Sequence, residues 1–411
     1  MTKRTVEEQS SEEATLKRKV IVAIEYLIIA ILAIGTFYIV SKFTLFAPVS
    51  STKQSYSQNE HPRVAKKERI DRIPSTKALQ TITTLNPWGI AFDSLHQIVW
   101  VAEPGCEPKP ICLTKAPGII GEYDLLDGSY IQDFPEPPGY TRPVFVAIDA
   151  NANVWFTEPN SDAIGELNPQ NLTWNQWKVP DGSTPFDLTF DKNGNLWFTE
   201  FDANKIGFFN PITDKLVENT IPTPDSNPYG ITRDPRGNLW FTENRLSVGQ
   251  IGSFTPTSSG TVAIIVHQVT TAQPHLITTD KQGNIWYSEA FGGSIGEYKP
   301  ASGNSVDYPV SLGICAHESV CKTHISGISV DNEGDIWYSD SELDLVGYLI
   351  PSTGEVVTKT VSNQHEGRSN QNDSAYDGLA VDGYNNVWFT EPYSSLIVMW
   401  PNKTVEPFAH A

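Results

Sequence analysis

A tryptophan-led tetrapeptide occurs seven times in this chain and constrains its fold more than any other feature. The tryptophans are separated by 55, 42, 43, 46, 51 and 51 residues. A period of roughly 40 to 50 residues with one aromatic signature per unit is typical of a β-propeller. We therefore predict an all-β, seven-bladed β-propeller of four-stranded blades. The seven copies are Trp100–Glu103, Trp155–Glu158, Trp197–Glu200, Trp240–Glu243, Trp286–Glu289, Trp337–Asp340 and Trp388–Glu391.

The last residue of the tetrapeptide is acidic in all seven copies. A residue needed once for chemistry should not occur seven times, so we interpret these acids as structural acceptors of backbone hydrogen bonds between blades. A turn of the form Asp-x-x-Gly-Asn precedes several tetrapeptides, as at Asp191–Asn195 and Asp280–Asn284. Similar spacings occur in calcium loops, but the recurrence favours a hairpin turn in which glycine adopts positive φ.

Residues 20–41 are the one long apolar stretch outside the repeats. Val20–Val40 contains 21 residues with a single charge, Glu25. At about 1.5 Å per residue this stretch is about 31 Å long, enough to span a bilayer core. The preceding Lys17–Lys19 favours an N-terminus in the cytoplasm and a propeller outside the cell. A cleaved signal peptide is the alternative, although its apolar core is usually about 7–15 residues. The predicted parts are a cytoplasmic tail (1–19), a transmembrane anchor (20–41), a flexible stalk (42–75) and the propeller (76–411).

Charge is distributed unevenly between these parts. Residues 1–75 carry 12 Lys/Arg and 8 Asp/Glu, which leaves 17 and 40 for the rest of the chain, a balance of −23. A domain this acidic repels phosphate backbones, so we predict no nucleic-acid partner. The predicted partners are instead the membrane, through residues 20–41, and a small molecule, glycan or peptide at the channel mouth.

The four cysteines come in two pairs with the same spacing. Cys106 and Cys112 form one pair, and Cys315 and Cys321 form the other. An even number of cysteines outside the membrane predicts two disulfides that close small loops, with cross-pairing as the alternative. The spacing does not match a zinc knuckle.

Three long insertions are expected on one face of the propeller, where loops usually carry binding sites. They are Pro104–Pro117, Ser311–Thr323 and Ser362–Ala375. The outermost strand of one terminal blade is expected from either Lys77–Thr84 or Thr404–Ala409. One of these segments would complete the blade built from the other end of the chain and so remove an exposed sheet edge.

One position of the repeat should line the mouth of the central channel. It begins the innermost strand of each unit, five residues before the turn aspartate. This ring is aromatic on one side and polar on the other, which predicts ligand recognition, whereas a plain channel plug is the simpler alternative. The seven ring residues are Trp88, Val144, Phe186, Tyr229, His275, Ser326 and Asp377.

His275 and His324 are the best chemical candidates near this ring. They come from adjacent units, so their side chains could converge, and two imidazoles could hold a metal or transfer protons near neutral pH. A solvated polar role is the alternative. Arg142 and Gln273 occupy neighbouring slots.

The repeats resemble the virginiamycin B lyase (streptogramin lyase) family over roughly residues 77–411. The resemblance rests on Pro-Tyr-Gly-Ile-Thr, Asn-Leu-Trp-Phe-Thr-Glu and Asn-Lys-Ile-Gly, as in Asn227–Thr232, Asn238–Glu243 and Asn204–Gly207. It implies a seven-bladed propeller and elimination that opens a lactone, with magnesium held by two glutamates beside a catalytic histidine.

The lyase site itself does not carry over. If His275 is the first family histidine, the metal glutamates fall on His324 and Ser341 and the catalytic histidine falls on Ser326. If His275 is the catalytic histidine, the metal glutamates fall on Gln273 and Ala290. Neither register keeps both carboxylates, and magnesium prefers anionic oxygen ligands.

Three functions follow from these observations. The first is a membrane-anchored, extracytoplasmic propeller that binds a ligand at the channel mouth. The second is a lyase or hydrolase of cyclic esters with a rearranged site on His275 and His324, joined by Glu289. The third is a protein–protein assembly module. The metal and the ligand are not determined by the sequence.

Overall fold

The computed structural model describes residues 87–105, 118–245, 249–269, 273–310, 323–343, 345–360, 378–391, 396–400 and 408–410. The chain divides into two compact units, Met1–Arg72 and Ile73–Ala411, and every described residue belongs to the second. The described part contains no helix that is long and apolar enough for a membrane span. The predicted anchor at 20–41, the stalk, all four cysteines and Asp377 lie outside the described residues.

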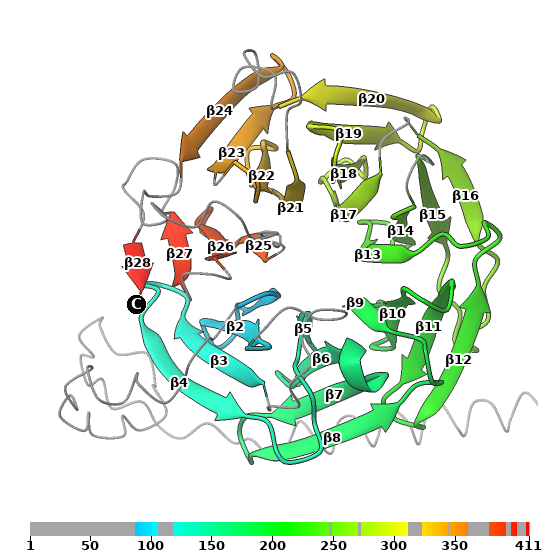
Figure 1. The fold of residues 1–411 in the computed structure, drawn as a ribbon, viewed down its shortest axis with the longest axis vertical. Coiled ribbons are helices and arrows are strands. Elements are labelled where there is room, and N and C mark those ends of the chain that lie inside the picture. Colours follow the sequence, from blue (N-terminus) through cyan, green and yellow to red (C-terminus); the bar gives the residue numbers. More distant parts are fainter. Residues whose placement is uncertain are drawn as a thin grey trace, which may run out of the picture. The chain divides into compact units, whose positions relative to one another are not determined.

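Within the described ranges the strands form seven four-stranded antiparallel sheets, arranged around a common centre (Figure 1). The predicted propeller of four-stranded blades is confirmed. Each blade is one contiguous piece of chain whose first strand is innermost. The first four blades are β1–β4 (Ile90–Asp93, Ile98–Glu103, Ile119–Asp124, Tyr130–Pro135), β5–β8 (Val146–Ile148, Val154–Glu158, Ala163–Asn168, Thr173–Lys178), β9–β12 (Pro185–Phe190, Leu196–Glu200, Lys205–Asn210, Lys215–Thr220) and β13–β16 (Pro228–Arg233, Leu239–Glu243, Gln250–Phe254, Ile265–Gln268). The last three are β17–β20 (Pro274–Thr279, Ile285–Glu289, Ser294–Lys299, Asn304–Pro309), β21–β24 (Ile325–Val330, Ile336–Asp340, Leu345–Ile350, Glu355–Thr360) and β25–β28 (Leu379–Val381, Val387–Glu391, Leu396–Trp400, Phe408–His410), and a short 3₁₀ turn η1 (Pro159–Ser161) follows β6.

The last blade is completed by its own end of the chain. β28 pairs with β27, with His410 opposite Ile397. Of the two closures left open by the sequence, the one in which Thr404–Ala409 completes the first blade is not found, because the first blade already obtains its outer strand from β4. Side-chain bonds join the two terminal blades instead: Tyr384 Oη donates to Gln97 Oε1 at 2.8 Å. Lys77–Thr84 lies outside the described residues.

The turn aspartate and the tetrapeptide tryptophan hold each other. In the fifth blade Asp280 Oδ2 accepts the Trp286 indole N–H at 3.1 Å, while Oδ1 accepts the backbone N–H groups of Gln282 and Asn284. The predicted hairpin turn is present, and its carboxylate is committed to these donors. Asp234 is the turn aspartate of the fourth blade. Burial acts to raise its pKa, but hydrogen bonds to its carboxylate hold that pKa below its usual value. The same aspartate–tryptophan bond joins Asp149 to Trp155, Asp191 to Trp197, Asp234 to Trp240, Asp331 to Trp337 and Asp382 to Trp388.

The hydroxyl in the tetrapeptide positions the ring residue of the next blade. Thr242 Oγ1 donates to the carbonyl of His275 at 2.5 Å and accepts the N–H of Gly230 in its own blade. Five of the ring residues are thereby fixed by the blade before them. Equivalent bonds join Thr157 to Phe186, Thr199 to Tyr229, Ser288 to Ser326 and Thr390 to Trp88.

The acidic residues that end the tetrapeptides are buried structural groups. In the first six blades, beginning with Glu103 and ending with Asp340, each of these residues is at most 2% exposed. Their bonds agree with the expected backbone bonds between blades only in part. Asp340 accepts the backbone N–H of His324, and Glu158 accepts that of Thr141, which lies on the connection from the first blade into the second. Other bonds come from side chains of the same blade: Gln176 Nε2 donates to Glu158, and the hydroxyl of Tyr123 donates to Glu103.

Burial raises the pKa of several of these carboxyl groups. It raises the pKa of Glu103 to about 8 and that of Glu243 to about 7. The pKa of Glu200 is raised to about 8 by burial, and the neighbouring Glu218 adds to the shift. Between about pH 4.5 and the folded-state pKa, the unfolded chain loses protons that the folded chain keeps. The free energy of unfolding must therefore fall as pH rises through this window.

We expect the melting temperature to fall by several degrees between pH 5 and pH 8, measured by differential scanning calorimetry. Replacing Glu200 and Glu243 by glutamine together should flatten this slope, since glutamine does not titrate. The matched control replaces the exposed Glu355 by glutamine and Asp181 by asparagine, which removes the same net charge. Equal slopes in the two double variants would contradict the assignment to the buried pair.

Candidate functional site

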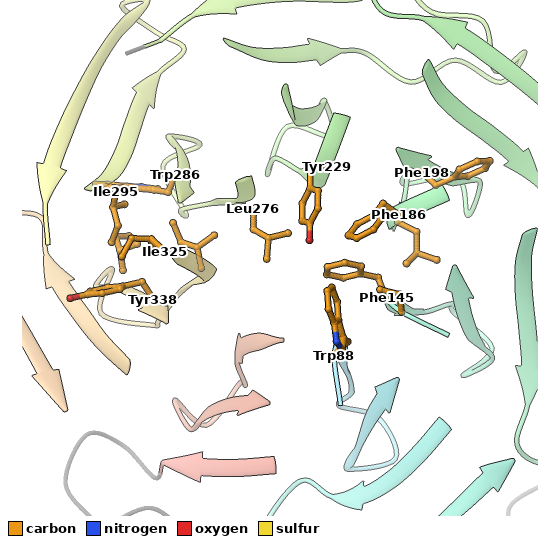
Figure 2. Packing of buried hydrophobic residues seen from close by; sticks show 14 of the residues in the cluster. Trp88, Phe145, Phe186, Phe198, Tyr229, Leu276, Trp286, Ile295, Ile325 and Tyr338 are labelled. Carbon is orange, nitrogen blue, oxygen red and sulfur yellow. The ribbon is translucent and has the colours of Figure 1, made fainter. Parts of the chain in front are cut away.

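The aromatic half of the predicted ring is packed against itself. Trp88, Phe186 and Tyr229 meet in edge-on and tilted contacts, with the rings of Phe186 and Tyr229 only 4.3 Å apart between centroids. Figure 2 shows these side chains pointing toward one another across the centre of the propeller. Each is at most 9% exposed. We call Trp88, Phe145, Phe186 and Tyr229 the aromatic plug, because they fill this side of the channel.

In the second blade the plug residue is Phe145 and not the predicted Val144. Phe145 contacts Trp88, Phe186 and Tyr229, whereas Val144 is fully buried beside it. The repeat is broken here, since Ala102 replaces the tetrapeptide hydroxyl. The Val144 carbonyl accepts the N–H of Gly89 at 2.9 Å instead. This missing hydroxyl was the sequence signal for an altered position.

His275 lies at the edge of the plug in a dense hydrogen-bond network. Its ring stacks on Tyr229 with centroids 4.0 Å apart, and it is 6% exposed. Asn244 Nδ2 lies 2.9 Å from His275 Nδ1 and 2.9 Å from the carbonyl of Pro274. Gln273 Nε2 donates to both the side-chain and the backbone oxygen of Asn244, at 2.7 and 3.0 Å. The start of β17 in the fifth blade is therefore tied to the residue that follows β14, the second strand of the fourth blade.

His324 converges with His275 as predicted from their adjacent blades. The centroids of the two imidazoles are 5.2 Å apart. His324 is half-buried, and Ser341 Oγ lies 3.2 Å from its Nδ1. Phe291, which no sequence pattern indicated, also stacks on His324, with centroids 5.2 Å apart and an interplanar angle of 7°, and it is 65% exposed. We call Phe291, His324, His275 and Tyr229 the aromatic row.

Other predicted neighbours have structural tasks. Ser326 is fully buried, and its hydroxyl donates to the carbonyl of His324 at 3.3 Å. Arg142 is 2% exposed and donates to the carbonyl of Pro104, at the start of the first insertion. Glu136 accepts the N–H of Arg142 at 2.8 Å, and burial raises the pKa of Glu136 to about 8. These groups anchor the chain on this face.

The repeats match a known protein family. The model of the virginiamycin B lyase family matches residues 114–315. This segment belongs to the virginiamycin B lyase family. It contains His275 and Phe291, and the contacts of the aromatic row reach from it to His324 in the following blade. No curated protein matches the chain.

Solved structures from this family have the same fold. A streptogramin B lyase aligns with a TM-score of 0.63 and 20% identity, covering 80% of this chain and 95% of its own. The virginiamycin B lyase of Staphylococcus aureus aligns with a TM-score of 0.59 and 24% identity, covering 76% and 92%. A catalytically inactive histidine-to-alanine variant of that lyase, solved with quinupristin, aligns with a TM-score of 0.60 and 24% identity, covering 76% and 93%.

The positions that the virginiamycin B lyase family would use for magnesium are adjacent here but lack carboxylates. In one register they are Gln273 and Ala290, whose backbones are joined by an N–H to carbonyl bond of 3.1 Å. In the other they are His324 and Ser341, joined by the same bond at 3.1 Å. An amide with a methyl group, or an imidazole with a hydroxyl, is a poor donor set for a hard cation. The residues present do not fit magnesium.

Among the described residues, one acidic group has carboxylates close enough together for a cation: Asp331, Glu333 and Asp335. It lies in the turn between β21 and β22, where Asp331 already accepts the N–H groups of Glu333 and Asp335. This turn group is separate in the sequence from the aromatic row, and its main carboxylate is committed to the hairpin.

Proposed function

We propose that this protein is a binding propeller that holds a ligand with a flat or ring-shaped group at the aromatic row. The observation that carries the proposal is the continuous contact of rings from Phe291, which is 65% exposed, to His275, which is 6% exposed. An exposed aromatic side chain next to two imidazoles offers both stacking surface and polar contacts. The aromatic row, and not the whole predicted ring, forms the proposed binding site, because Trp88 and Phe186 are packed inside the aromatic plug.

Ligand binding at the aromatic row would not require the magnesium-dependent reaction of the family. Relatives with this fold are named as lyases, but the described residues at both candidate magnesium positions are neutral or imidazole groups. A bound cyclic depsipeptide would then meet stacking and hydrogen-bonding groups without a magnesium ion to polarise its ester. Quinupristin, held by the related inactive lyase, is a suitable first probe.

We expect the full-length protein in detergent to bind quinupristin in isothermal titration calorimetry, with an affinity that excess EDTA leaves unchanged. Replacing Phe291 or His324 by alanine should weaken binding about tenfold, the effect of losing about 1.4 kcal/mol of ring contact. Ile212→Ala is the matched control, because Ile212 is 90% exposed in the hairpin turn between β11 and β12. Absence of binding, or an equal loss in the Ile212 variant, would reject the ligand site.

The second candidate is a lyase or hydrolase of cyclic esters that uses His275 and His324. The convergence of the two imidazoles at 5.2 Å favours it, and the buried Glu289 would be its third member. Mass spectrometry distinguishes opening of the quinupristin lactone from simple binding. Opening that is lost in a His275→Ala, His324→Ala double variant would establish the enzyme, and opening that persists would remove these residues from it. An assembly role through the outer blade edges is the third candidate, tested by crosslinking in cells.

We propose, in addition, that residues 20–41 anchor the protein in the cell membrane, with the N-terminus in the cytoplasm and the propeller outside. The apolar length of the segment and the preceding Lys17–Lys19 support this orientation. Protease treatment of intact cells should digest the propeller and spare the tail. Two disulfides, Cys106–Cys112 and Cys315–Cys321, are part of the same extracytoplasmic proposal.

A further inference from the structure

The side chains around His275 determine which of its two ring nitrogens carries the proton. The Asn244 amide can be oriented without ambiguity from its neighbours. Its Nδ2 lies 2.9 Å from the carbonyl oxygen of Pro274, which only accepts, so this atom must be the donor. Its Oδ1 in turn accepts from Gln273 Nε2 at 2.7 Å.

The orientation of Gln273 is fixed by the same reasoning. Its Nε2 lies 3.0 Å from the backbone carbonyl oxygen of Asn244, and the Gln273 amide oxygen could not take this place because it carries no hydrogen to donate. The relay therefore runs in one direction only, from Gln273 through Asn244 to His275. A flipped amide at either position would place two acceptors against each other.

Because Asn244 Nδ2 is a donor, the atom 2.9 Å away, His275 Nδ1, must accept. We infer that Gln273 and Asn244 are positioning residues that hold His275 as the Nε2–H tautomer. His275 then presents an N–H donor, and not a lone pair, to any group that approaches Nε2. The stack on Tyr229 at 4.0 Å and the 6% exposure keep the ring in this place.

The tautomer also defines which ligand groups His275 can bind. This step rests on the proposed binding function. A ligand group that approaches Nε2 must therefore be an oxygen acceptor, such as a carbonyl, an ester or a carboxylate. A neutral imidazole N–H polarises such an oxygen without taking a proton from the ligand. The same arrangement opposes the use of His275 as a general base, because its lone pair is already engaged by Asn244.

Solid-state nitrogen NMR on the full-length protein, labelled with ¹⁵N,¹³C-histidine, tests the inference without any ligand. We expect the His275 signals, identified by their loss in a His275→Asn variant, to show a non-protonated Nδ1 and a protonated Nε2. A protonated Nδ1 in the wild-type protein would overturn the inference.

The variant Asn244→Asp should reverse the tautomer, because a carboxylate can only accept and would draw the proton to Nδ1. Asn193→Asp is the matched control: it adds the same charge at an exposed position in the turn between β9 and β10. An unchanged His275 tautomer in the Asn244→Asp protein would also overturn the inference.

A binding measurement links the tautomer to the ligand. Quinupristin affinity should fall about tenfold or more in Asn244→Asp, because the donor toward the ligand oxygen is lost, and stay unchanged in Asn193→Asp. If the wild-type tautomer is as stated and quinupristin does not bind, the binding function fails while the tautomer stands. If quinupristin binds and the affinity of Asn244→Asp is unchanged, the donor role of His275 toward the ligand is rejected.

Discussion

A Gly252→Ala variant is expected to lose about 3 kcal/mol of unfolding free energy, the upper end of the usual cost of overpacking a tight core. Gly252 lies on β15 directly opposite Phe241 of β14. A Cβ at Gly252 would be 2.0 Å from Phe241 Cζ, and Phe241 is fully buried. The ring cannot move away, because it is enclosed between two blades. Urea unfolding followed by circular dichroism measures the loss.

Gly383→Ala is the matched control for this prediction. No atom lies within 4 Å of a Cβ built at Gly383, and its backbone has no positive φ. We expect a change within about 0.5 kcal/mol there, as for exposed sites in general. Comparable losses in the two variants would show that the cost comes from the backbone and not from the aromatic ring. The same contact recurs at Gly165, Gly207 and Gly296, so it is a rule of the fold.

An Asp280→Ala variant is expected to lose about 3–4 kcal/mol, because it removes several hydrogen bonds worth about 1 kcal/mol each and leaves a buried donor unsatisfied. Asp280 accepts from Gln282 N–H, Asn284 N–H, the Asn284 side chain and the Trp286 indole. Trp286 is 2% exposed, so water cannot replace the lost acceptor. The melting temperature and urea midpoint both report this loss.

The first blade supplies an internal control for the aspartate–tryptophan bond. Asp93 occupies the equivalent turn, but its Oδ2 pairs with His96 Nδ1 at 2.6 Å, and the Trp100 indole N–H has no hydrogen-bond partner among the described residues. Asp93→Ala should therefore cost about half as much as Asp280→Ala, since no indole donor is orphaned by the change. An equal cost at both positions would mean that the turn bonds alone carry the stability.

The repeat made the blades predictable because each of its residues performs the same local task in most of the described blades, the first blade being the main exception. The tryptophan bonds the turn aspartate, and the hydroxyl bonds the next blade, so short-range patterns suffice to place them. The ring was less predictable. Its register is correct at Phe186, Tyr229 and His275, but the plug residue in the second blade is Phe145, where Ala102 breaks the hydroxyl pattern. Phe291 follows a tetrapeptide without any repeat signature, so only its contact with His324 reveals it.

The sequence by itself determined the number and order of the strands within a blade, the turn between the first two strands and the proximity of His275 to His324. These depend on period, alternation and neighbouring blades, which are written along the chain. Only the tertiary structure decided that the aromatic half of the ring is filled core, that the terminal strand stays in its own blade, and that Asn244 and Gln273 orient His275. Such facts arise because side chains from different blades compete for the same space and the same donors, and that competition has no period in the sequence.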